Sequence, residues 1–227
     1  HAADWTVRQL AYAFNPRASN HRNDDYCEGT AWQWTWFVPH DVDGLVELMG
    51  GRDAFIGKLD SLFTADSKLE GESTSVDISG LIGQYAHGNE PSHHIAHLYN
   101  YVGQPWRTQE IVDEVLHTLY FNNPDGLSGN EDCGQMSAWY ILNAMGFYQV
   151  CPGKPVYSIG RPLFNEATVH LKDGKSFKVI AHNNSRDNKY VRSIVLNGNK
   201  LETPFFTHQD IVDGGTLELT MGSEPLK

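Results

Sequence analysis

The chain has 227 residues, of which 40% are hydrophobic and 20% are charged, an ordinary composition for a globular protein large enough to bury a core. Its net charge of −11, from 17 basic and 28 acidic residues, argues against a nucleic-acid partner, because phosphate contacts need clustered Lys and Arg. We also expect no disulfide framework, because the three cysteines cannot all pair, and no membrane span; no signal peptide is visible in the sequence.

The first two thirds of the chain carry the period of amphipathic helices. Apolar residues three and four positions apart predict helices over about residues 42–49, 55–63 and 111–119, and a fourth from Met136 through Phe147. Gly50 ends the first of these helices and Pro105 opens the third. Long connections rich in Gly, Asn, Asp and Pro occupy residues 65–91 and 121–134. We therefore expect paired helices from about residue 30 to residue 150.

From about residue 168 the apolar period changes to two, which is typical of strands. Asp173-Gly174 and Asn197-Gly198 have the composition of two-residue hairpin turns. A last strand is expected over residues 217–221. This pattern predicts an antiparallel β unit over about residues 165–222. The joint between the helical and β regions is expected near residues 151–155.

Three stretches combine carboxylates, amides and aromatics more densely than a core needs: residues 24–41, 83–94 and 125–139. In the first, Glu28 is followed by Gly29 and then by three tryptophans within five residues. The flat apolar faces of a sugar ring stack on aromatic side chains, while a neighbouring acid protonates the departing oxygen. The tryptophans also suit a hydrophobic core, and that alternative remains open.

The second stretch offers ligands for a metal ion. Asn89 and Glu90, just before an expected helix start at Pro91, supply hard oxygen ligands of the kind that calcium binds. Their alternative role is helix capping. His93 and His97 have the spacing of a zinc-binding pair, but no HExxH motif and no thiolate accompany them.

The third stretch places Glu131 beside Asp132 in a Gly-rich loop. Because adjacent side chains point in different directions, we expect the two carboxylates to do different jobs; both can also cap the following helix. Cys133 is a weaker candidate nucleophile, since no base stands beside it in the sequence. A glycosidase needs an acid on the leaving-group side and a second carboxylate on the opposite face, which activates water in an inverting enzyme. Glu28 and Asp132 suit these two roles.

These stretches resemble signature motifs of glycoside hydrolase family 92, and the similarity covers nearly the whole chain beyond about residue 14. It rests on the runs Tyr26-Cys27-Glu28-Gly29-Thr30-Ala31-Trp32-Gln33-Trp34, Val38-Pro39-His40-Asp41, His87-Gly88-Asn89-Glu90-Pro91-Ser92-His93-His94, Gly103-Gln104-Pro105-Trp106, Gly129-Asn130-Glu131-Asp132-Cys133-Gly134-Gln135-Met136-Ser137-Ala138-Trp139 and Ile159-Gly160-Arg161-Pro162-Leu163-Phe164.

The resemblance implies a calcium-dependent exo-α-mannosidase that removes terminal α-linked mannose from glycans with inversion of configuration. By motif, Glu28 corresponds to the general acid, Asp132 to the general base, and Glu90 and Asn89 to metal ligands. The family also uses a second acidic position beside the base, where Asn130 and Glu131 flank Asp132. The residues expected to bind the substrate are Cys27, Trp32, His87, Glu131 and Gln135.

The resemblance also implies an architecture. Family members are several hundred residues longer and combine an N-terminal β-sandwich with an (α/α)6 toroid. We therefore expect a mainly α chain: residues 1–160 as part of the toroid, residues 161–227 as a C-terminal antiparallel β unit, and no sandwich. The missing N-terminal portion is an expected partner, and a secreted, periplasmic or cell-surface location is expected. Two alternatives remain, a toroid-type glycoside phosphorylase and a non-catalytic calcium-dependent carbohydrate-binding fragment.

Overall fold

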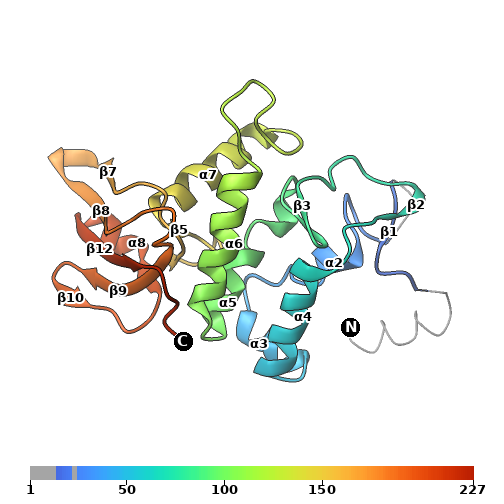
Figure 1. The fold of residues 1–227 in the computed structure, drawn as a ribbon, viewed down its shortest axis with the longest axis horizontal. Coiled ribbons are helices and arrows are strands. Elements are labelled where there is room, and N and C mark those ends of the chain that lie inside the picture. The colour runs from blue at the N-terminus through green and yellow to red at the C-terminus, as the bar shows by residue number, and fades with distance from the viewer. Residues whose placement is uncertain (1–13, 22–24) are drawn as a thin grey trace. The chain divides into compact units, whose positions relative to one another are not determined.

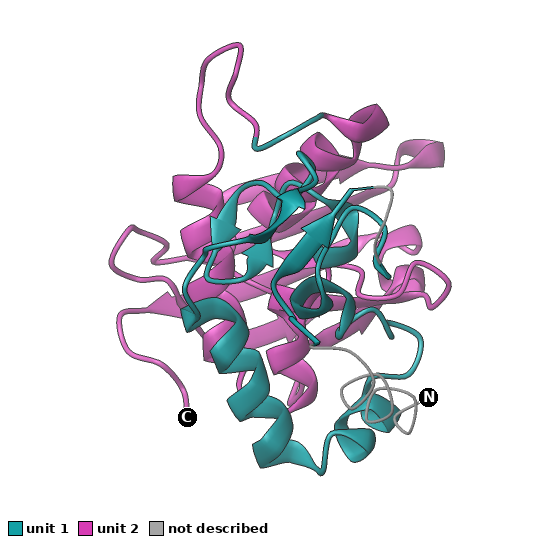
Figure 2. Cartoon of the chain, turned by 90° about the vertical axis from the view of Figure 1, so that its right-hand side faces the viewer, with its two compact units in different colours: residues 1–92, 128–130 teal, residues 93–127, 131–227 magenta. Residues whose placement is uncertain are grey.

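The computed structural model describes residues 14–21 and 25–227 (Figure 1). The chain divides into two compact units (Figure 2). Unit 1 comprises residues 1–92 and 128–130, and unit 2 comprises residues 93–127 and 131–227. Within the described ranges there are seven α-helices and several small sheets, so the chain is a mixed α/β protein and not a mainly helical one.

The described part of unit 1 combines helices with two short strand pairs, β1 with β2 and β3 with β4. Its elements are β1 (Ala18–Asn20), α2 (Ala31–Trp34), α3 (Val42–Leu48), α4 (Arg52–Thr64), β2 (Glu70–Ser73), β3 (Leu81–Ile82), β4 (Tyr85–Ala86) and the 3-10 turn η1 (Glu90–Ser92). The core gathers large side chains that are fully buried, among them Trp36, Phe55 and Tyr85. Trp36 packs edge-on against Phe55 with 5.3 Å between ring centroids, which confirms the core interpretation for that tryptophan.

The helical segments of unit 2 are η2 (Ile95–His97), α5 (Leu98–Tyr101), α6 (Pro105–Thr118), η3 (Asp132–Gly134), α7 (Gln135–Met145), η4 (Lys172–Gly174) and α8 (His208–Val212). The predicted helices near residues 42, 55 and 111 are confirmed as α3, α4 and α6. The predicted run of a helix through Phe147 is wrong. Gly146 has a φ of 101°, a left-handed conformation that ends α7, and Phe147 begins a strand.

Two sheets complete unit 2. A five-stranded sheet has the order β10 (Asn199–Lys200), β9 (Tyr190–Leu196), β12 (Gly215–Gly222), β8 (Ser176–His182) and β7 (Glu166–His170); a three-stranded sheet has the order β11 (Phe205–Thr207), β6 (Val156–Ile159) and β5 (Phe147–Tyr148). Turns form at both predicted dipeptides, with φ positive at all four residues. Asn197-Gly198 is the predicted two-residue connection, between the paired Leu196 and Asn199, whereas Asp173-Gly174 lies in the longer connection between the paired His170 and Ser176.

The expectation of a wholly antiparallel β unit is wrong. Strand β12 lies between β8 and β9 and pairs with β8 in parallel. An apolar period of two identifies a strand but carries no information on its direction. The strand is placed by burial, because Leu217, Leu219 and Met221 alternate into a core that also takes Phe177. The strands β1 to β4 were not expected either; they are short, and β2, β3 and β4 lie in the connection that follows helix α4.

A buried ion pair joins the helical and β parts of unit 2. The guanidinium of Arg161, which is 2% exposed, lies 2.9 Å (Nε to Oδ1) from Asp113 on α6. The α6 side chain of Gln109 also accepts a hydrogen bond from the backbone N of Val191 on β9. The Ile159–Phe164 run is thus a packing motif, because its arginine satisfies a buried carboxylate.

Candidate active site

Glu28 lies in unit 1, two residues before the cap of helix α2. Thr30 caps that helix: its hydroxyl accepts from the N of Trp32, and Gln33 Oε1 accepts from the backbone N of Thr30 at 2.6 Å. Glu28 has a φ of 51°, in the left-handed region that residues with a Cβ adopt at an energetic cost. Its side chain and that of Cys27 are exposed.

Two side chains hold the backbone around Glu28. Asn89, which is 6% exposed, donates from Nδ2 to the carbonyl of Glu28 at 2.8 Å. Trp34 Nε1 donates to the carbonyl of Cys27 at 2.9 Å. Gly29 is required between them, because a Cβ there would lie 2.6 Å from Trp34 Nε1. The first and second polar stretches of the sequence therefore meet at Glu28 and Asn89.

Asn89 and Glu90 fit a hard cation by chemical type. Glu90 is exposed at the start of η1, and its backbone N donates to Asn89 Oδ1 at 3.2 Å. One carboxylate and one amide oxygen suit calcium, which takes six to eight oxygens including carbonyls and water. Over the described ranges, no group of three or more His, Cys, Asp and Glu side chains is arranged to hold a metal ion.

Two more expected binding residues lie in unit 1. His87 is fully buried, and its Nδ1 hydrogen-bonds to the hydroxyl of Tyr85 at 2.8 Å. Trp32 is half-buried, and Lys58 Nζ lies 4.1 Å from the centroid of its ring. Burial lowers the pKa of Lys58. The cation over its ring covers part of Trp32, while Trp36 is the tryptophan that serves the core.

Asp132 lies in unit 2 at the start of η3, directly before helix α7. It is half-buried and has a φ of 52°. Cys133 and Gly134 follow with φ of 55° and 96°, so three consecutive residues adopt the left-handed conformation. Asp and Asn visit this region more readily than other residues, and three of the other described examples, Asp173, Asn183 and Asn197, are of those types. Glu28 and Cys133 are the exceptions.

Glu131 and Gln135 flank this turn. Glu131 accepts hydrogen bonds on both carboxylate oxygens, from the backbone N and the hydroxyl of Ser137, each at 3.0 Å. Gln135 Nε2 lies 3.0 Å from His93 Nδ1 and 3.2 Å from the hydroxyl of Tyr148. Burial raises the pKa of Tyr148 to about 12, so this hydroxyl stays protonated at neutral pH.

The pair His93 and His97 does not have the arrangement of a zinc site. The ring of His97 is fully buried, with Nδ1 3.0 Å from Ser158 Oγ and Nε2 2.9 Å from Asn143 Oδ1. Because Asn143 Nδ2 donates to the Trp139 carbonyl, its Oδ1 accepts, and His97 carries its proton on Nε2. Burial lowers the pKa of His97 to about 4. This histidine is a neutral structural link between η2, α7 and β6.

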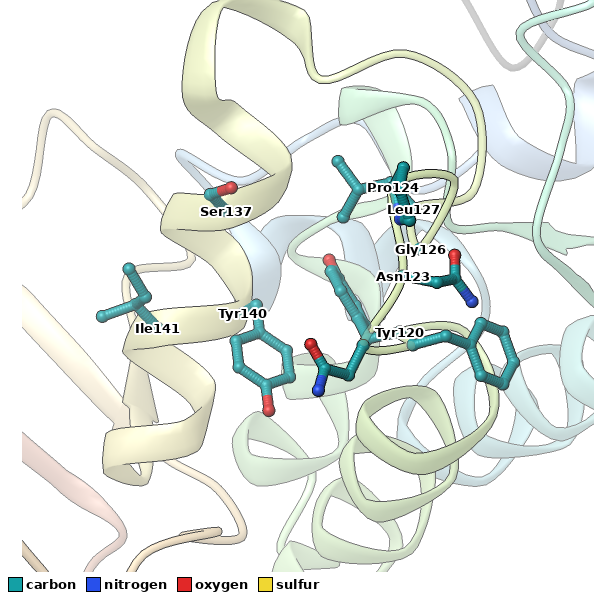
Figure 3. A pocket seen from close by; sticks show the side chains of 10 residues that line it. Tyr120, Asn123, Pro124, Gly126, Leu127, Ser137, Tyr140 and Ile141 are labelled. Carbon is teal, nitrogen blue, oxygen red and sulfur yellow. The ribbon is translucent and has the colours of Figure 1, made fainter.

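A pocket of about 600 Å³ opens in unit 2 beside α7 (Figure 3). Aromatic, amide and aliphatic side chains line it. They are Tyr120, Phe121, Asn122, Asn123, Pro124, Gly126, Leu127, Ser137, Tyr140 and Ile141. It shares Ser137 with the carboxylate of Glu131, so the pocket adjoins the segment that carries Asp132.

Sequence patterns did not identify several residues that position the candidate site. Trp34 was given no role of its own, Asn89 was expected as a metal ligand or a helix cap, and Tyr148 was not singled out. No local signal could have found these contacts, because Asn89 lies 61 residues from the residue it anchors. The motif residues themselves were found because polar side chains are concentrated there.

Comparison with known proteins identifies the family of this chain. Residues 5–223 match the model of the glycosyl hydrolase family 92 catalytic domain. The α-mannosidase BT3965 of Bacteroides thetaiotaomicron, solved with mannoimidazole, is 42% identical, with a TM-score of 0.87 over 94% of this chain and 28% of its own. The inverting mannosidase BT2199 of the same organism is 44% identical, with a TM-score of 0.76 over 88% of this chain and 28% of its own.

A protein of Arthroderma benhamiae described as an uncharacterized secreted glycosidase is 32% identical over 87% of this chain and 24% of its own length. The chain thus spans about a quarter of the length of these relatives. No helix in the described part of the chain is long and apolar enough to cross a membrane. The match over nearly all of its residues means that this chain belongs to glycosyl hydrolase family 92.

Proposed function

We propose that this chain carries catalytic residues of an exo-α-mannosidase that hydrolyses terminal α-linked mannose from glycans with inversion of configuration. One structural observation supports the choice of residues more than any other. Glu28 and Asp132 both stand on left-handed backbone, at φ of 51° and 52°, within segments that side-chain hydrogen bonds hold in place. Strained backbone that the surroundings enforce gathers at functional sites.

In this proposal Glu28 is the general acid. Its exposed carboxyl donates a proton to the glycosidic oxygen as the bond to the anomeric carbon breaks. Asp132 is the general base and takes a proton from the water that attacks the opposite face of the same carbon. Inverting enzymes hold these two carboxyl groups about 6.5–9.5 Å apart so that the water fits between sugar and base.

The proposed substrate contacts follow from the two segments. Cys27 and Trp32 flank the acid, His87 lies in the segment that carries Asn89, and Gln135 follows the base. Because Gln135 Nε2 lies against His93 and Tyr148, its amide is oriented, and we propose that its Oε1 accepts from a sugar hydroxyl. The relatives' mannosidase descriptions, one of them with mannoimidazole bound, support mannose as the sugar.

Calcium is the proposed cofactor, with Glu90 and Asn89 as its ligands in this chain. When bound, the ion would help to hold the hydroxyls of the terminal mannose and ease distortion of its ring. Asn89 also anchors Glu28, so the same side chain would connect the metal site with the acid. Support comes from the oxygen donor set of these two residues and from family membership.

The proposed larger architecture is an (α/α)6 toroid, of which residues 1–160 would form part, with residues 161–227 as a C-terminal β unit. The remainder of a family-length enzyme, including a β-sandwich, would then be the partner of this chain. A location outside the cytoplasm is proposed on the description of the fungal relative as secreted. The short coverage of every relative named above supports the view that more protein takes part in the activity.

Two alternatives predict different products. A phosphorylase of similar architecture would use inorganic phosphate in place of water and would need Glu28 but not Asp132. A non-catalytic carbohydrate-binding fragment would bind mannose in the presence of calcium without turnover. The left-handed backbone that is maintained at Asp132 favours hydrolysis, because a phosphorylase does not need a second carboxylate on the face that phosphate attacks.

Proton NMR of the product tests the proposal. The longest natural form of the protein that carries this chain is incubated with an α-mannoside, and the anomeric signals are followed from the first minutes. We expect β-mannose first, followed by mutarotation. First appearance of α-mannose contradicts inversion, and mannose 1-phosphate formed only with added phosphate establishes the phosphorylase instead.

A further inference from the structure

Glu131 stands next to the proposed base, but its carboxylate is directed to the following helix. Both of its oxygens accept from Ser137, the third residue of α7, at 3.0 Å each. The backbone N of a third helical residue has no partner within its own helix, so an outside acceptor is needed there. A negative charge at this end also suits the helix dipole.

The backbone of Glu131 holds the same turn. Its carbonyl accepts from the N of Gly134 at 3.2 Å and from the N of Met136 at 3.3 Å. These contacts enclose Asp132, Cys133 and Gly134, the three consecutive left-handed residues. Such a conformation is unfavourable for Asp132 and Cys133, which carry a Cβ, and it persists only where the surroundings impose it.

A second contact supports the turn from the neighbouring connection. The hydroxyl of Tyr120 donates to the carbonyl of Met136 at 3.1 Å. Burial, and then the charge of Glu131, raise the pKa of Tyr120, so this donor keeps its proton. Tyr120 and Ser137, the residue that the Glu131 carboxylate holds, line the same pocket (Figure 3).

We propose that Glu131 is a positioning residue: its carboxylate fastens the start of α7 through Ser137 and thereby holds Asp132 in the left-handed turn from which it acts. This inference rests on the proposed function, because it needs Asp132 to be the base. It gives Glu131 a task other than contact with the sugar. Asp132 then owes its orientation to its immediate neighbour in the sequence.

The first test compares three variants of the longest natural form of the protein in steady-state hydrolysis of an activated aryl α-mannoside. Glu131→Ala should lower kcat about 100-fold with little change in KM, since small misplacement of a reacting group has effects of that size. Glu131→Gln keeps an amide that pairs with the Ser137 backbone N and hydroxyl, so it should stay within about fivefold of wild type. Glu131→Ala combined with Ser137→Ala should be no worse than Glu131→Ala alone.

A second test relieves the strain itself. Glycine adopts the left-handed conformation without penalty, so Cys133→Gly introduced into Glu131→Ala should recover about fivefold in kcat. This rescue is not expected if Glu131 binds the sugar. The matched control is Asp210→Ala. The Asp210 carboxylate accepts from the backbone N and the hydroxyl of Thr207 at the start of α8, as Glu131 does from Ser137 at the start of α7. Its loss should lower the melting temperature without changing kcat.

The outcomes separate the possibilities. Glu131→Gln as inactive as Glu131→Ala, a raised KM, and no rescue by Cys133→Gly would overturn the positioning role in favour of direct substrate contact. A lowered melting temperature with unchanged kcat for Glu131→Ala would reduce Glu131 to a structural cap and also overturn it. Wild-type protein without activity on any α-mannoside would contradict the proposed function, which is a different result from an active wild type with these variant patterns.

Discussion

The loop that carries Glu28 and the turn that carries Asp132 reach the same left-handed backbone by different means. Glu28 is held from a distance in the sequence, by Asn89, the residue before η1, and by Trp34 acting on the neighbouring Cys27. Asp132 is held locally, by Glu131 and Ser137 on either side of it. The turn at Asp132 is therefore maintained by residues next to it in the sequence. The loop at Glu28 depends on the folding of the rest of unit 1.

This difference predicts which substitutions disturb which carboxylate. Changes in the 83–94 segment should affect protonation of the leaving group, because they release Glu28. Changes at the start of α7 should affect water attack, because they release Asp132. The following predictions test this separation.

Within the 83–94 segment, the largest effect is expected at Asn89. Asn89→Ala removes the donor to the Glu28 carbonyl and should lower kcat about 100-fold for substrates with poor leaving groups. Asn89→Asp keeps an oxygen for a metal but lacks the donor, so it should be as damaging as Asn89→Ala if anchoring matters most. Steady-state kinetics of both variants decide between the two roles.

Asn188→Ala is the matched control, because it removes a similar hydrogen bond from Nδ2 to a backbone carbonyl, that of Asn183, within unit 2. Its kcat should equal that of wild type. Full activity of Asn89→Asp with loss in Asn89→Ala would mean that Asn89 acts through the metal and that the Glu28 loop does not need this anchor.

Next in size is a pH effect on unit 2. The ordinary pKa of His97 is near 6.5, and burial lowers it to about 4 in the folded protein, so folding favours the neutral ring. Stability from this group is complete above pH 6.5 and is lost as the pH falls toward 4, by on the order of 3 kcal/mol at most. The free energy of unfolding, measured by urea titration from about pH 7.5 to about pH 4, shows this loss of stability.

The controls are two histidine variants. His97→Gln should be less stable at neutral pH but should show a flatter decline in the acid range, since the group that titrates is gone. His170→Gln, at an exposed position on β7, should retain the wild-type decline. Equal pH dependence of wild type and His97→Gln would show that His97 is not responsible.

A smaller effect is expected from calcium, and it should be confined to one of the two segments. At about tenfold excess over its dissociation constant, an ion that binds only the folded protein stabilises it by about 1.4 kcal/mol. Hydrogen exchange should slow in residues 25–30, which Asn89 anchors, and not in residues 131–137. Glu90→Gln should weaken the effect, and zinc acting in place of calcium would contradict the assignment.

The same contrast explains how much could be predicted from the sequence. Helices α3, α4 and α6 and the positions of the turns at Asp173-Gly174 and Asn197-Gly198 follow from local periods and turn residues, and they were predicted correctly. The parallel pairing of β12 with β8 joins residues about forty apart, and no local pattern determines it. The end of α7 was missed because Phe147 continued the apolar spacing while Gly146 broke the helix.

In the candidate site too, contacts between residues close in the sequence were predicted and contacts between distant residues were not. A capping role for Glu131 was foreseen as an alternative, because acids before a helix often serve that purpose. The anchoring of Glu28 by Asn89 was not foreseen, since it joins two loops that the sequence separates. Gln135 was singled out, but its partners His93 and Tyr148 come from other elements and became visible only in the fold.

The roles of Glu28 and Asp132 are tested most directly by varying the leaving group. In the longest natural form of the protein, Glu28→Gln should lower kcat/KM about 1,000-fold for mannosides with poor leaving groups and about tenfold or less for activated aryl mannosides, which need little protonation. Asp132→Asn should lower both by about 1,000-fold, because water attack is needed in either case. Equal losses for both substrates in Glu28→Gln, or a loss confined to poor leaving groups in Asp132→Asn, would contradict the assignment of acid and base.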